Sequence, residues 1–182
     1  MLEFFFSDDH FTHTLAALVL VSRLGDIGST LLATPTLALE ANPMARRFKK
    51  STLMLGLGLA FIPYYSTPLA IVVLVPSLFV TGSNFLRGWV AHAVGEAEML
   101  ALLYRAARRT SRSRALAFTF GGTAAIAMAG AVLLLLSGGS DTWAYWFACG
   151  ILMYALAIGV HSTFFILRIF RQAAQPTPPG VV

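Results

Sequence analysis

The first long apolar segment of the chain contains an arginine and an aspartate. Arg23 and Asp26 are three positions apart and Thr30 follows four positions later, so the three side chains share one face of a helix. A charge at the centre of a membrane-spanning helix costs about 2.5–3.5 kcal/mol on insertion scales, and such charges often mark functional sites. Two interpretations stay open: the pair belongs to a functional site, or the two charges neutralise each other and lock helix packing.

A second polar stripe lies in a later apolar segment. Ser77, Thr81 and Asn84 recur at helical spacing, and Arg87 follows them. Because the two segments run in the same direction, we expect Asp26 and Arg87 at similar depth and in contact. The stripe predicts either a polar cavity open to the cytoplasm or hydrogen bonds between helices, which contribute about 0.6 kcal/mol each.

Three further residues could hold a metal ion. His92 and Glu96 are four positions apart on a helix, and His161 is expected toward the same end of the bundle. In the alternative interpretation, Glu96 and Glu98 pair with Arg105 on a solvated face. No catalytic residue is assigned and no cofactor is named, because the chain shows no nucleophile–base pair, phosphate-binding loop or nucleotide motif.

Glu40 and Asn42 follow the first segment at its cytoplasmic end. They are candidates for the mouth of the cavity that Asp26 lines, although Glu40 could instead form a salt bridge with Arg46 or Arg47.

The stretch Asp26-Ile27-Gly28-Ser29-Thr30, followed by Glu40-Ala41-Asn42-Pro43, resembles a known pattern. The pattern is Asp-x-x-Thr-Thr, a short spacer and Glu-x-Asn-Pro, and it belongs to an uncharacterised family of small prokaryotic multi-spanning membrane proteins. The resemblance covers about residues 20–50, with Ser29 in place of the first Thr. It implies a small bacterial or archaeal membrane protein and no particular activity.

The elements that position these residues are membrane-spanning helices. The chain is 57% hydrophobic and 12% charged, against about 25% charged residues in soluble domains. We therefore predict an all-α, polytopic helix bundle in the lipid bilayer, forming one domain over residues 1–170 with a disordered tail at 171–182. Its expected spans are about 11–34, 43–62, 68–93, 115–136 and 142–169. The second span could instead be re-entrant, because it is apolar only from about Leu53.

Basic residues predict the orientation. They gather in the first loop, the third loop and the tail, and five spans place all three on one side. The N-terminus is then outside and the C-terminus cytoplasmic in a cell inner (plasma) membrane. This distribution also explains the net charge of +5 without a nucleic-acid partner.

Three functions are compatible with these features. The leading hypothesis is a non-catalytic accessory or scaffold subunit, bound to other membrane subunits or to copies of itself, since Gly121, Ala125 and Ala129 form a small-residue face suited to close helix packing. A transporter of small solutes or protons would use Asp26, Asn84 and Arg87. An intramembrane metal-dependent enzyme would act on lipid-like substrates, but the sequence does not favour an enzyme.

Overall fold

The computed structural model describes residues 8–42, 47 and 56–175, and the regular secondary structure in this part of the chain is all helical, joined by loops and turns. Four of the helices are long and apolar enough to cross a membrane. The predicted second span falls largely on residues 43–46 and 48–55, outside the described residues. The elements are α1 (Asp8–Ala33), the 3₁₀ helix η2 (Gly58–Tyr64), α4 (Thr67–Val94), α5 (Glu96–Arg109), α6 (Arg112–Leu136) and α7 (Trp143–Ala173).

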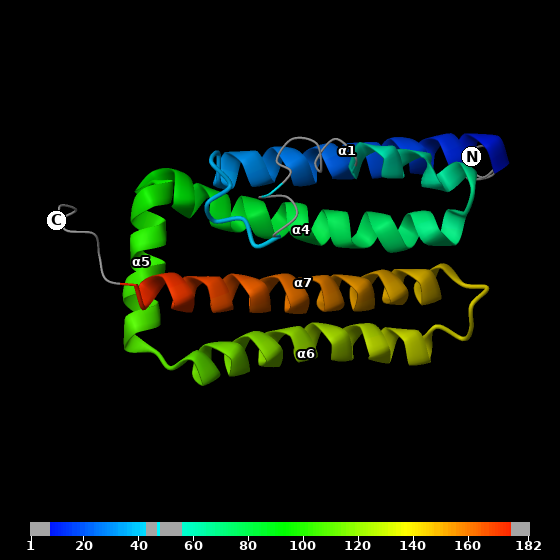
Figure 1. The fold of residues 1–182 in the computed structure, drawn as a ribbon. Coiled ribbons are helices and arrows are strands. Elements are labelled where there is room, and N and C mark those ends of the chain that lie inside the picture. Colours follow the sequence, from blue (N-terminus) through cyan, green and yellow to red (C-terminus); the bar gives the residue numbers. More distant parts are fainter. Residues whose placement is uncertain (1–7, 43–46, 48–55, 176–182) are drawn as a thin grey trace.

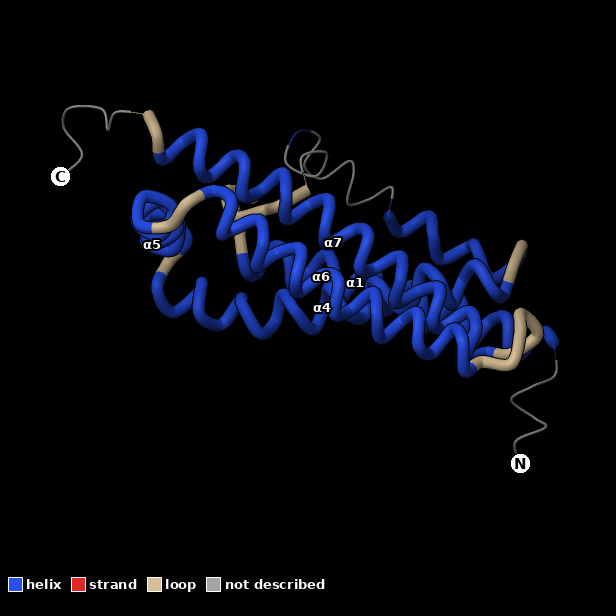
Figure 2. Tube along the Cα trace, turned by 90° about the horizontal axis from the view of Figure 1, so that it is seen from below, coloured by secondary structure: helices blue, strands red, loops and turns tan. Residues whose placement is uncertain are grey.

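The long helices form a bundle in which α1, α4 and α7 run in the same direction and α6 runs in the opposite one (Figure 1). The helix α5 lies across one end of this bundle, and Figure 2 shows it nearly end-on. The helix η2 packs against α1 and α4 near the other end. The helix α4 packs against both α1 and α7, and α6 packs against α7, so α4 lies between α1 and α7 and α6 lies beyond α7.

The helix starts follow from local side-chain chemistry. The hydroxyls of Ser66, Ser111 and Thr142 each accept a hydrogen bond at 3.3 Å from a backbone amide in the first turn of α4, α6 and α7, respectively. The bounds of α1, α4, α6 and α7 lie within a few residues of four of the five expected spans. The last helix continues to Ala173, so it includes the first three residues of the predicted tail, and residues 176–182 lie outside the description.

Gly95 separates α4 from α5. This residue has φ of +91°, a backbone conformation that L side chains rarely adopt. The chain turns there, and α5 therefore leaves the direction of α4 and crosses the end of the bundle (Figure 1).

Glycines allow close packing between the helices. A Cβ atom at Gly150 would lie 2.7 Å from Cβ of Val75 on α4, and one at Gly130 would lie 3.1 Å from side-chain atoms of Ile151 on α7. The small-residue face predicted on α6 takes no part in this close packing. A Cβ atom placed at Gly121 would have no atom within 4 Å. Ala125 and Ala129 are exposed as well, so this face points away from the described helices.

Large apolar side chains cover the outside of the bundle. Phe118 is 82% exposed and Leu135 84% exposed, both on α6. In water such a surface would drive aggregation, whereas in lipid it matches the solvent. The buried apolar core is correspondingly small and includes Leu15, Val19 and Ala70 between α1 and α4.

Candidate functional site

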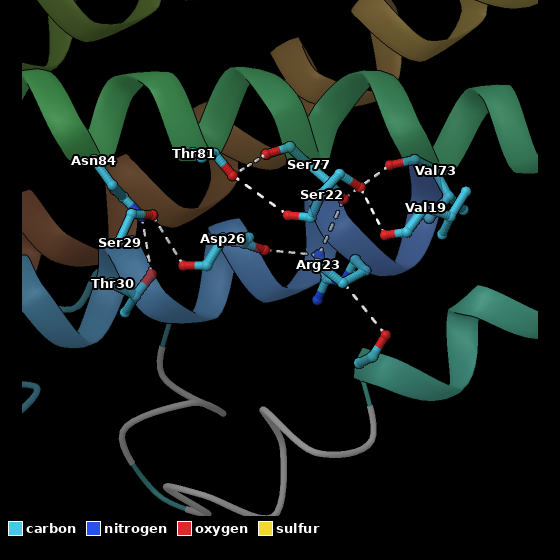
Figure 3. Close-up of polar contacts among 11 residues, drawn as sticks. Val19, Ser22, Arg23, Asp26, Ser29, Thr30, Val73, Ser77, Thr81 and Asn84 are labelled. Atoms are coloured by element: carbon cyan, nitrogen blue, oxygen red, sulfur yellow. Dashed lines mark hydrogen bonds and ion pairs between the residues drawn. The ribbon is translucent and has the colours of Figure 1, made fainter. Parts of the chain in front are cut away.

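Arg23 is the centre of a polar cluster between α1 and α4 (Figure 3). One guanidinium nitrogen, Nη1, donates to Oδ2 of Asp26 at 2.7 Å and to Oγ of Ser77 at 3.2 Å. Its Nε donates to the backbone carbonyl of Gly56 at 3.3 Å. The side chains of Arg23 and Asp26 are 20% and 16% exposed. The predicted pair is therefore a largely buried ion pair that also ties α1 to α4 and to residue 56.

The polar stripe of α4 bonds to α1 further along the same interface. Asn84 donates from Nδ2 to Oγ1 of Thr30 at 2.9 Å. The hydroxyl of Thr81 donates within its own helix and lies 3.4 Å from the carbonyl oxygen of Ser22 (Figure 3). The expected contact between Asp26 and Arg87 does not form, because the Asp26 carboxylate is paired with Arg23 on its own helix.

A cavity of about 330 Å³ lies between α1, α4 and α7 and reaches the loop that follows α1. It brings together residues that are far apart in the sequence. All five members of the predicted intramembrane cluster line it, and so do both predicted mouth residues and one of the three candidate metal ligands: Arg23, Asp26, Thr30, Asn84, Arg87, Glu40, Asn42 and His161.

The residues of α7 that line this cavity were not predicted from the sequence, apart from His161. Tyr154 and Ser162 line it, and Tyr154 stacks on Phe79 of α4 with ring centroids 5.1 Å apart. A signal for this wall does exist in the sequence. Tyr154, His161 and Ser162 are polar residues in an apolar segment, seven and eight positions apart, which is the spacing of one helix face.

The charges in the cavity are balanced in number but not all are paired. Arg23 and Asp26 neutralise each other, and Oε1 of Glu40 accepts a hydrogen bond from the backbone amide of Asn42 at 2.7 Å. The side chain of Arg87 makes no hydrogen bond or ion pair with any residue that the structure describes. Its guanidinium therefore keeps its donors available to a molecule in the cavity.

The three candidate metal ligands are not brought together. Within the described ranges, no group of three His, Cys, Asp or Glu residues is placed to hold a metal ion. His161 lines the cavity, whereas the carboxylate of Glu96 is used elsewhere. Glu98 forms the exposed ion pair with Arg105 that the sequence suggested, at 2.5 Å.

Glu96 binds the loop that follows α1, in an arrangement that we call the Glu96 clasp. Its carboxylate accepts hydrogen bonds from the hydroxyl of Thr34, from the hydroxyl and amide of Thr36 at 2.9 and 3.2 Å, and from the amide of Ala38 at 3.0 Å. Desolvation raises the pKa of the Glu96 carboxyl, but these bonds to its charged form outweigh it and lower the pKa below the ordinary value. Arg168 of α7 completes the attachment by donating to the carbonyl oxygen of Ala38 at 2.7 Å.

Comparisons of this chain with protein-family models, with curated proteins and with solved structures find no match.

Proposed function

We propose that this membrane protein binds a small polar solute in the cavity between α1, α4 and α7 as the binding step of transport. The cavity is the observation that supports this proposal, because it gathers charged and hydroxyl groups among apolar helices. Its volume of about 330 Å³ lies at the lower end of the range for small-molecule pockets, which favours a small solute.

The charges favour a zwitterionic solute. Once Arg23 and Asp26 have neutralised each other, one cation and one anion are left on the walls, Arg87 and Glu40. A solute with an acidic group for Arg87 and an ammonium group for Glu40 would leave no net charge in the low-dielectric interior. A net anion or cation would carry an uncompensated charge into the membrane.

Uptake into proteoliposomes tests this proposal. The purified protein is reconstituted, and uptake of labelled glycine and alanine is compared with that of succinate and glycerol. Loss of a hydrogen bond to a charged group weakens binding by roughly ten- to hundredfold, so Arg87→Gln should lower zwitterion uptake at least tenfold at low solute concentration. The matched control is Arg171→Gln, since Arg171 is also exposed but lies outside the cavity.

Two results would contradict solute binding at this site. One is uptake of every solute at the level of protein-free liposomes. The other is equal uptake by wild type and Arg87→Gln. Arg87 suits this test because it has no described partner, so its replacement should leave the fold intact.

We further propose five membrane crossings, with the N-terminus outside and the C-terminus in the cytoplasm of an inner membrane. The parallel course of α1 and α4 supports this, because a chain that crosses twice in one direction must return between the two crossings (Figure 1). In a Cys149→Ala background, a cysteine at Ser113 should react with a membrane-impermeant maleimide only from the cytoplasmic side. A cysteine at Asp141 should react only from outside, and the reverse pattern would refute this orientation.

An accessory subunit is the second candidate, and one observation favours it. The small residues Gly121, Ala125 and Ala129 form a face of α6 that the described part of this chain does not use, and such faces suit close packing with another helix. Gly121→Leu should then abolish recovery of a partner subunit or of a homo-oligomer in native mass spectrometry. Recovery of the same assembly by this variant would remove the support.

A further inference from the structure

A second, apolar crevice lies at the end of the bundle where α5 crosses it. The crevice has a volume of about 160 Å³ and lies between α5, the start of α6 and the last turns of α7. All of its described walls are apolar except at Thr110, and they include Leu103, Ala107, Phe165 and Phe170. It is separate from the solute cavity, because the two share no lining residue.

Arginines surround the point where α5 meets α6. Arg109 precedes Thr110 and Arg114 precedes Ala115, and both Thr110 and Ala115 line the crevice. The side chains of Arg109, Arg112 and Arg114 are exposed and make no hydrogen bond or ion pair within the described part of the chain. Nearby Arg105, by contrast, is neutralised by Glu98 at 2.5 Å.

In a membrane crossed by the four long helices, α5 would hold this junction at the boundary between lipid and water. It lies across the ends of the spanning helices rather than along them (Figures 1 and 2). Helices in this position bury an apolar side in the lipid and direct their basic side chains to the headgroups. Its last turn carries Arg108 and Arg109 beside the junction, and in such a membrane these arginines would lie near the headgroups.

We propose that this junction binds one anionic phospholipid, with its phosphate on Arg109, Arg112 and Arg114 and one acyl chain in the crevice. Guanidinium groups match phosphate oxygens in charge and geometry, and basic pockets beside membrane helices bind acidic lipid headgroups. An apolar crevice beside them matches the second part of the same molecule. A free phosphate would leave the crevice unused, and a neutral apolar ligand would leave the arginines unused.

Native mass spectrometry of the full chain in mild detergent tests this site. Palmitoyl-oleoyl phosphatidylglycerol and the corresponding phosphatidylcholine are added at equal concentration. We expect one retained phosphatidylglycerol per chain, with clear preference over phosphatidylcholine. Each arginine near an anionic headgroup strengthens binding about fivefold, so Arg112→Gln should weaken it about fivefold and replacement of all three arginines by Gln about a hundredfold.

Two further variants serve as controls. One tests the acyl chain separately from the headgroup, and the other distinguishes the lipid site from the solute cavity. Ala107→Phe fills the crevice and should lower retention of phosphatidylglycerol even with every arginine present. Arg87→Gln removes an equally exposed and unpaired arginine from the solute cavity and should leave lipid retention unchanged.

Three results would overturn the proposal. Equal retention of the two lipids would show that the arginines do not select the headgroup. Full retention by Ala107→Phe would show that the crevice holds no acyl chain. Displacement of the lipid by an equal concentration of glycerol phosphate would show that a free phosphate group is the ligand.

Discussion

Replacing Glu96 by alanine removes the acceptor of all four hydrogen bonds in the Glu96 clasp. A hydrogen bond to a charged group contributes about 1.5–3 kcal/mol, but water replaces part of this contribution here because the clasp is only partly buried. We therefore expect the free energy of unfolding to fall by about 2–4 kcal/mol. At roughly 2–4 °C per kcal/mol for a chain of this size, the unfolding midpoint should fall by roughly 4–16 °C.

Tryptophan fluorescence during thermal unfolding in detergent provides the assay, since the chain has three tryptophans. The matched control is Glu98→Ala, two positions further along the same first turn of α5. Its ion pair with Arg105 is 54–55% exposed, and exposed pairs contribute at most about 1 kcal/mol. Equal losses in Glu96→Ala and Glu98→Ala would refute the clasp as a structural contact.

The same carboxylate gives a pH dependence. The folded state lowers the pKa of Glu96, so its contribution to stability is complete above the unfolded pKa and is lost as the pH falls through the folded pKa. Glu96→Gln cannot titrate at this position, so the stability gap between wild type and Glu96→Gln should be largest near neutral pH and close in acid. A gap that does not change with pH would show that the charged form is not what the loop binds.

Two further predictions concern the helix interfaces, and both are measured by the same unfolding assay. Asp26→Asn leaves Arg23 without its counter-charge in a largely buried position and should lower the free energy of unfolding by about 3 kcal/mol. Adding Arg23→Met should recover part of that loss. A double variant no more stable than Asp26→Asn would contradict the ion pair. Gly150→Ala places a Cβ 2.7 Å from Cβ of Val75 and should lower the free energy of unfolding by about 1–3 kcal/mol. The control Gly121→Ala meets no atom within 4 Å and should leave the stability unchanged. Equal losses in the two variants would contradict the packing described.

The spanning helices could be predicted because their signals are local. Each is a long apolar run, and three of them begin at a capping residue, as with Ser66 before α4 and Thr142 before α7. Several residues of the cavity could be predicted for a related reason. A charge or amide inside such a run, as at Asp26 or Asn84, is unfavourable toward lipid and is therefore expected to face other helices.

Which side chains bind one another could not be predicted, because these contacts depend on how far each helix extends. Spacing along one helix suggested a metal shared by His92 and Glu96, but Glu96 reaches Thr34, which lies 62 positions away in the chain. That contact exists because the chain turns at Gly95 beside the end of α1. The direction of the small-residue face at Gly121 could not be predicted either, because periodicity identifies a helix face but not the neighbour that the face contacts.

The long sequence separations in the Glu96 clasp have a consequence for synthesis of the chain. The partners of residues 34–38 lie 58–62 positions later at Glu96 and 130 positions later at Arg168. At a translation rate of 5–20 residues per second, Glu96 emerges about 3–12 s after this loop and Arg168 about 7–26 s after it. The loop beside the cavity therefore acquires its final contacts only after the last turns of α7 have been made, and the cavity cannot be completed before then.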